Sequence, residues 1–185
     1  MSAIADAIAA FFARYDWPVD HLDDDGDPEL GPERVSVTSV KGEHGTWPLL
    51  VAVVGEELAY LVVQSIVPPE APNGDEVAVL ELLTRMNDGL VDGCFELNFD
   101  DGTIRLRSAI PLRSLGALDV ETLTNLVGDL VTGNVTTADR FIPAMEAVID
   151  FGMHPAIAVA AVEAGLDPRP HADDDVADEG AEDEA

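Results

Sequence analysis

Apolar positions in the first third of the chain change from helical to alternating spacing. Residues 3–15 carry an apolar stripe that recurs every three or four positions and ends at Trp17-Pro18, which predicts a first helix. The stretch 16–33 holds eight acids and no base, so it is expected to be a loop. Alternating or continuous apolar runs then predict three strands of an antiparallel meander, at residues 34–40, 47–54 and 58–66.

A second helix is predicted after the prolines that follow the third strand. Asn73 can cap this helix, and Glu76 stands three residues later, where it would complete a capping box. The residues expected to line the helix are Leu80, Leu83, Met86, Asn87 and Leu90.

The alternation on either side of Asp101-Gly102 predicts a β-hairpin. A two-residue turn at these positions would pair residues whose numbers sum to 203. Phe99 would then lie opposite Ile104, and Glu96 opposite Arg107. Exposed charge pairs of this kind contribute little, so the arginines of the hairpin are first interpreted as structural.

The last part of the folded region is predicted to be helical. Asp119 can cap a helix whose apolar stripe continues to Val148, but Asn134 interrupts the stripe. Because a proline removes a helical hydrogen bond, Pro143 together with the stretch around Asn134 predicts a break and hence two helices. Residues 155–163 then predict a final short helix that begins at a proline.

This order of elements indicates the fold class. Helix, three strands, helix, two strands and helices predict an α+β domain with a single antiparallel sheet of about five strands, covered by helices. The domain is expected to span residues 1–167. Residues 168–185 contain eight acids and one base, so they are predicted to form a disordered acidic tail.

The charge of the chain limits its partners. There are 37 acidic and 9 basic residues, which gives a net charge of −28. The tail carries −7, which leaves −21 on the predicted domain. This charge excludes unaided binding to nucleic acid or to an anionic membrane, because both need clustered Lys and Arg. We expect a halophilic protein whose self-repulsion is screened by concentrated salt; a docking face for a basic partner and a nucleic-acid mimic are the alternatives.

Cysteine content and hydropathy indicate a cytoplasmic protein. Cys94 is the single cysteine, which excludes an internal disulfide and a thiolate zinc site made by this chain alone. It begins a predicted strand and is expected to be a small buried residue. No export signal is apparent, and no apolar run reaches the roughly 20 residues that span a bilayer.

Common catalytic and metal-binding motifs are missing from the sequence. There is no Gly-x-Ser-x-Gly, no His-Glu-x-x-His and no P-loop. The Asp-rich run 23–27 fails the EF-hand template, because Pro32 stands where a ligating glutamate is needed. The histidines, His21, His44, His154 and His171, are far apart in the sequence. We therefore expect no catalytic, cofactor or metal residues.

Several sequence segments resemble the YbjN family, in order over residues 4–164. They are Trp17-Pro18, Leu82 to Asn87, Gly93 to Leu97, Asp101 to Arg107, Asn134-Val135 and Ala138 to Phe141. The resemblance implies the fold of type III secretion chaperones and the role of a bacterial sensory transduction regulator, a binding module and not an enzyme. It also implies a homodimer that binds a protein partner.

Two hypotheses about the site follow. The first is a chaperone-like adaptor in which Arg85, Asn87 and Arg140 contribute to partner binding, although capping and surface pairing would also explain these residues. The second is a small-molecule-binding or enzymatic domain with a pocket between sheet and helices. Trp17, Trp47 and Tyr60 could line that pocket, but aromatic residues of this kind are more often core.

Overall fold

A single antiparallel sheet organises the chain in the computed structural model, which describes residues 2–22, 35–55, 59–71, 76–113, 115 and 117–170. The described strands have the order β1-β2-β3-β4-β6-β5 across the sheet. Their bounds are β1 (Asp20–Leu22), β2 (Val35–Lys41), β3 (Thr46–Val54), β4 (Tyr60–Ile66), β5 (Cys94–Leu97) and β6 (Ile104–Pro111). The helices are α1 (Ser2–Arg14), α2 (Glu76–Asn87), α3 (Val120–Ile149) and α4 (Pro155–Glu163). The predicted α+β class is confirmed.

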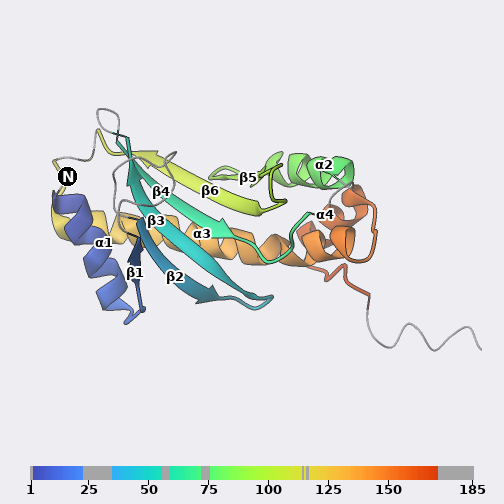
Figure 1. Cartoon of the computed structure of the whole chain (residues 1–185), viewed down its shortest axis with the longest axis horizontal. Helices are drawn as coiled ribbons and strands as arrows, with labels where there is room; N and C mark the ends of the chain where they lie inside the picture. The colour runs from blue at the N-terminus through green and yellow to red at the C-terminus, as the bar shows by residue number, and fades with distance from the viewer. Residues whose placement is uncertain are drawn as a thin grey trace, which may run out of the picture.

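Helix α3 runs along one face of the sheet, with α1 at one end of the molecule and α2 and α4 at the other (Figure 1). The strands turn alternate residues toward this helical layer. From β3, for example, Trp47, Leu49 and Val51 enter the core, and each is at most 1% exposed. From α3, Val127 and Ile142 are fully buried among them. The core therefore lies between the sheet and α3.

The sheet has one more strand than expected, and α2 buries a slightly different face. The short strand β1 lies inside the predicted loop 16–33 and pairs with β2. In α2 the buried residues include Val79 and Leu82, whereas Leu80 is 40% exposed, so the predicted stripe was wrong at Leu80. Cys94 begins β5 as predicted, but its side chain is exposed and not buried.

The β5–β6 hairpin has a different register from the predicted one. Glu96 pairs with Arg105 and Leu97 with Ile104, so partner numbers sum to 201 and not to 203. The connection is longer because the Asp101 carboxylate accepts a hydrogen bond from the Thr103 backbone N–H at 2.8 Å, and Thr103 in turn bonds residue 98 across the loop. The shift is two residues, so every side chain keeps its face of the sheet.

The predicted break in the third helical region is absent, and α3 is one continuous 30-residue helix. Asp119 caps it as predicted and accepts a hydrogen bond from the Thr122 N–H at 2.8 Å. Asn134, which interrupts the apolar stripe, is 2% exposed and bonds Ser65 and Ser108 of the sheet. Pro143 is buried within the helix. Packing along the whole helix outweighs the roughly 3 kcal/mol that an interior proline costs.

The described chain continues three residues beyond the predicted domain boundary. Gly165 ends α4 with φ +74°, and Pro168 is buried behind it. Arg169 donates to Glu146 of α3 at 2.8 Å and to Asp167, and it also contacts His44 of the β2–β3 turn at 3.2 Å. This cluster attaches the end of the chain to α3 and to the sheet.

Three predictions fall on residues outside the described part of the chain. They are the cap at Asn73, which leaves the predicted capping box untested, the Asp-rich run 23–27, and the acidic tail from residue 171 onward.

Candidate functional site

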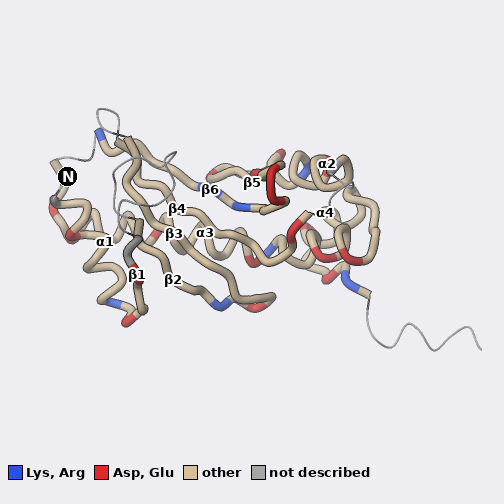
Figure 2. Tube along the Cα trace, in the orientation of Figure 1, with Lys and Arg blue, Asp and Glu red and all other residues tan. Residues whose placement is uncertain are grey.

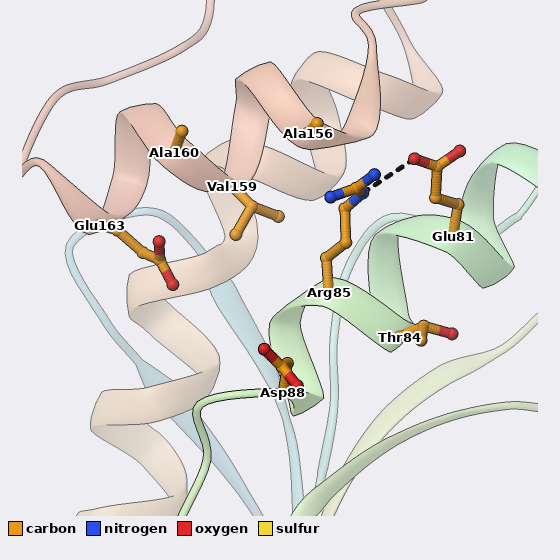
Figure 3. Close-up of a pocket in the computed structure, with 8 residues that line it drawn as sticks. All are labelled: Glu81, Thr84, Arg85, Asp88, Ala156, Val159, Ala160 and Glu163. Carbon is orange, nitrogen blue, oxygen red and sulfur yellow. Dashed lines mark hydrogen bonds and ion pairs between the residues drawn. The ribbon is translucent and has the colours of Figure 1, made fainter.

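A groove of about 660 Å³ opens between α2 and α4. Figure 3 shows that the two helices face each other across it, with side chains of both pointing into the space. We call it the α2–α4 groove. Its lining residues are Glu81, Thr84 and Arg85 of α2, Asp88 directly after the end of α2, and Ala156, Val159, Ala160 and Glu163 of α4.

The two walls of the α2–α4 groove differ in chemistry. On the α2 side, Glu81 and Arg85 are four residues apart and share one face of the helix, and Asp88 follows in the turn directly after it. On α4, Ala156 and Ala160 are one turn apart, and their small side chains leave the helix backbone accessible. One wall therefore offers charged groups and the other offers a shallow apolar surface.

Arg85 is the one residue of the predicted set that lies in this groove. Its Nε donates to Glu81 Oε1 at 2.8 Å, an i,i+4 ion pair in which both side chains are nearly half exposed. Exposed pairs of this kind contribute roughly 0.3–0.5 kcal/mol. The remaining guanidinium N–H groups face the groove and can donate to a bound group.

Two more carboxylates line the groove, that of Asp88 directly after α2 and that of Glu163 at the end of α4 (Figure 3). Within the part of the chain that the structure describes, no cation forms an ion pair with either carboxylate. The groove thus carries three acids and one base, and one of the acids is already paired with Arg85. Its uncompensated charge is negative.

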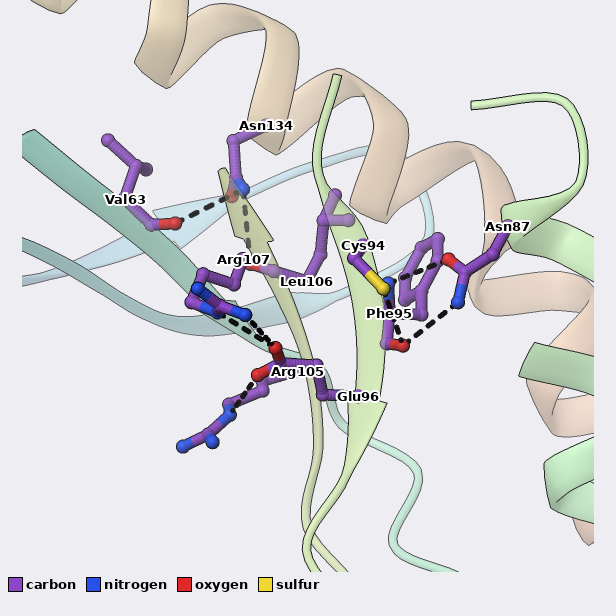
Figure 4. A network of polar contacts seen from close by, with 9 residues as sticks. All are labelled: Val63, Asn87, Cys94, Phe95, Glu96, Arg105, Leu106, Arg107 and Asn134. Atoms are coloured by element: carbon purple, nitrogen blue, oxygen red, sulfur yellow. Dashed lines mark hydrogen bonds and ion pairs between the residues drawn. The ribbon is translucent and has the colours of Figure 1, made fainter. Parts of the chain in front are cut away.

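Asn87, the second predicted residue, points away from the groove and toward β5. Its Oδ1 accepts a hydrogen bond from the Phe95 N–H at 2.8 Å, and its Nδ2 donates to the Phe95 carbonyl at 3.0 Å (Figure 4). The amide therefore bonds the outer edge of β5 as another strand would. Asn87 holds α2 against the sheet, and its role in partner binding stays a prediction.

Arg140, the third predicted residue, lies on α3 and is exposed. Its guanidinium carbon is 5.1 Å from the centre of the Phe141 ring, within the range of a cation–π contact. Phe141 packs edge-on against Phe95, so Arg140 sits above the aromatic contact that joins α3 to β5. The structure thus places Arg85, Asn87 and Arg140 at one end of the molecule but does not bring their side chains together.

The hairpin arginines form a separate cluster on the sheet face opposite α3 (Figure 4). Glu96 accepts from Arg105 Nε at 2.9 Å and from Arg107 Nε at 2.8 Å. Burial raises the pKa of Glu96, but the hydrogen bonds from Arg107 and Arg105 outweigh it, so the pKa is lowered overall. This arrangement agrees with the structural interpretation of the two arginines.

The three aromatic residues proposed for a small-molecule pocket lie apart. Trp47 is 1% exposed in the core near one end of β3, whereas Tyr60 pairs with Val54 at the opposite end of that strand. Trp17 packs instead against Phe11 of α1, with ring centres 5.8 Å apart. The interpretation as core and packing residues therefore fits Trp47 and Trp17, whereas Tyr60 is 41% exposed and lies outside the core.

Sequence patterns could not identify the α4 wall of the groove. The alanines 156 and 160 and the terminal acid Glu163 looked like parts of a short apolar helix. The available signal was the i,i+4 spacing of the two alanines, which permits close helix packing but does not name a partner element. Asp88 was equally inconspicuous, because acids are abundant in this chain.

The described residues contain no group of three or more His, Cys, Asp or Glu side chains arranged to hold a metal ion. No helix among them is long and apolar enough to cross a membrane.

The chain matches the model of a known protein family over most of its length. The model of the YbjN family, described as "Putative bacterial sensory transduction regulator", matches residues 5–147 of the 185. No curated protein matches the chain. The matched range includes α2 with Arg85 and Asn87 and ends within α3, before α4 begins.

Proposed function

We propose that this chain, which belongs to the YbjN family, is a non-enzymatic regulator that acts in the cytoplasm by binding another protein. The family description supports a regulatory role. The observation that carries the proposal is the α2–α4 groove, where a guanidinium and two carboxylates without an ion pair lie beside an exposed wall of small side chains. Groups of this kind recognise charged and apolar side chains of a partner.

The three predicted residues have different parts in this proposal. Arg85 contacts the partner directly, because its guanidinium lies in the groove. Asn87 acts by positioning α2, since both of its hydrogen bonds hold β5. Arg140 contributes an exposed positive charge from α3, outside the groove itself. Substitution of Arg85 should therefore weaken binding more than substitution of Arg140.

Two finer features belong to the same proposal. The chaperone-like resemblance suggests a homodimer, and the excess of acids suggests a surface adapted to high salt. Figure 2 shows acidic positions on α2, α4 and β5, whereas basic positions are few. At about 1 M salt the Debye length is roughly 3 Å, so the repulsion among these carboxylates would be screened.

The test is capture of the partner at native salt with a groove-filling variant. Ala160→Trp places a large ring on the exposed α4 wall of the groove. Ala9→Trp on α1 is the matched control, since it adds the same ring to an exposed helical alanine outside the groove. Stoichiometry is measured by mass spectrometry against wild type.

We expect Ala160→Trp to abolish recovery of the partner and Arg85→Ala to reduce it, with Ala9→Trp unchanged. Circular dichroism of each variant checks that the fold is retained. Equal recovery with wild type and Ala160→Trp would show that the groove is not the binding site. Recovery of the partner at the wild-type level with both Arg85→Ala and Arg140→Ala would show that neither arginine contributes to binding.

A further inference from the structure

We infer that the α2–α4 groove receives a basic amphipathic helix of a partner protein, an inference that rests on the proposed function and names the chemistry of the partner. The geometry of the walls is the first argument. Both walls are helices, and their lining residues recur every three or four positions. A third helix laid between them would present its own side chains at the same spacing.

The small residues of α4 set how closely such a helix can approach. Ala156 and Ala160 form a shallow track one turn apart, and a backbone can approach such a track more closely than one of large side chains. Exposed apolar groups lie beside it. Ile157 of α4 is 62% exposed, and Val77, one turn before Glu81 on α2, is 81% exposed. A partner with one apolar face would cover these groups.

The charges that line the groove indicate the sign of the charge on the partner's surface. Asp88 and Glu163 line the groove from its opposite sides, and neither forms an ion pair among the described residues. Two carboxylates across a groove repel each other, and a Lys or Arg placed between them would turn this repulsion into two attractions. Glu81 and Arg85 already pair with each other, but Glu81 can still bind a second cation and Arg85 can still bind a carboxylate. The partner surface is therefore predominantly basic.

The chain itself cannot supply this partner. Residues 171–185 hold eight acids and no base, so the tail has the same sign as the groove. A second copy brings another −28, and none of its described helices has a net positive charge. Charge complementarity therefore points to a different protein.

The test uses a fluorescein-labelled 20-residue peptide of Leu, Ala and Lys with all lysines on one helical face. Its affinity for the full chain is measured by fluorescence anisotropy. A peptide of the same composition with scrambled order, a Glu-for-Lys version and spermine serve as competing probes. The variant Asp88→Asn with Glu163→Gln removes the two unpaired groove charges. Glu121→Gln with Asp129→Asn, two exposed acids of α3, removes the same charge elsewhere.

We expect the groove variant to bind the amphipathic peptide about tenfold more weakly and the control variant less than about twofold more weakly, since each exposed pair contributes up to roughly 1 kcal/mol. The scrambled peptide should bind more weakly than the ordered one, and the Glu peptide should not bind. Ala160→Trp should also weaken binding, whereas Ala9→Trp should not.

Several results would overturn the inference. Equal losses in the two charge variants would show attraction to the acidic surface in general. Equal binding of the ordered and scrambled peptides would show that the groove binds a basic segment whether or not it is helical. Displacement of the peptide by spermine at equal charge would show that the groove binds a small polycation. If Ala160→Trp abolishes partner capture but the lysine peptide does not compete with the partner, the proposed function stands and the basic helix is wrong. If Ala160→Trp changes neither measurement, both fail.

Discussion

The buried amide of Asn134 is expected to be the strongest single polar contribution to the stability of this fold. Its Oδ1 accepts from Ser65 Oγ at 2.7 Å, and its Nδ2 donates to Ser108 Oγ at 2.9 Å and to the Leu106 carbonyl at 3.1 Å. Figure 4 shows the amide pointing from α3 onto the strands. These contacts join α3 to both β4 and β6, so they set the register of the helix over the sheet.

Asn134→Ala removes these three hydrogen bonds and a longer one, from Nδ2 to the Val63 carbonyl at 3.5 Å. Each of the three shorter bonds is worth about 1 kcal/mol net, with a range of roughly 0.5–1.5, so the loss is about 3 kcal/mol in the free energy of unfolding. The Ser65 hydroxyl, 0% exposed, would also lose its acceptor. The matched control is Asn125→Ala, which removes an exposed amide of the same helix that bonds Arg14. It should cost less than about 0.5 kcal/mol.

Urea unfolding followed by circular dichroism measures both variants, and a double-mutant cycle with Ser65→Ala tests the coupling. Because the two residues bond each other, their losses should not add, and the interaction energy should exceed about 0.5 kcal/mol. The apolar combination Ser65→Ala, Asn134→Leu and Ser108→Ala should be more stable than Asn134→Ala alone, since it leaves no hydroxyl or amide of this site buried and unpaired. A loss below about 1 kcal/mol for Asn134→Ala, or strict additivity in the cycle, would refute this reasoning.

Three other predictions follow from the same contacts. Asn87→Ala should lower the free energy of unfolding by about 1–3 kcal/mol and speed hydrogen exchange at the Phe95 amide, because it leaves the edge of β5 unbonded; unchanged exchange would contradict this. The pKa of Asp167 is lowered from 3.8 to about 2 by its hydrogen bond from Arg169, so its contribution is complete above pH 3.8 and is lost as the pH falls toward 2. The difference in melting temperature between wild type and Asp167→Asn should therefore be present at pH 5 and shrink toward pH 2, and a constant difference would exclude this carboxylate. Transfer of the whole chain from molar KCl to dilute buffer should reduce its far-UV circular dichroism through unscreened repulsion, whereas an unchanged spectrum would count against a salt-adapted surface.

Features decided by neighbouring residues were predictable from the sequence. The alternating run 47–54 became β3, Asp119 capped α3, and Pro155 began α4. In each case a side chain acts on the backbone within four residues of it, through pleating, a cap or a fixed φ angle. The α+β class followed, because the order of such elements allows few ways to bury their apolar faces.

Features that depend on distant residues were not predictable. The hairpin register depended on a loop closed by the Asp101 side chain. The continuity of α3 depended on two serines of the sheet that bond Asn134, although they lie 69 and 26 residues away from it in the sequence. A polar residue in an apolar stripe indicates a break in the helix when its side chain has no partner. When its side chain is hydrogen-bonded, the residue instead fixes the register of the helix over the sheet, and local spacing cannot distinguish the two cases.

The α2–α4 groove belongs to the second group. Its walls lie about 70 residues apart in the sequence, and neither wall has a motif that indicates the other. Arg85 could be selected because it lies in the family-like segment Leu82 to Asn87, on a helix expected to approach the sheet. Its position opposite two alanines and beside Asp88 and Glu163 was decided only by the packing of α2 and α4 at one end of α3. The sequence by itself determined the elements and the sign of the charge, and the tertiary structure decided which side chains share a surface, because that depends on contacts between residues far apart in the chain.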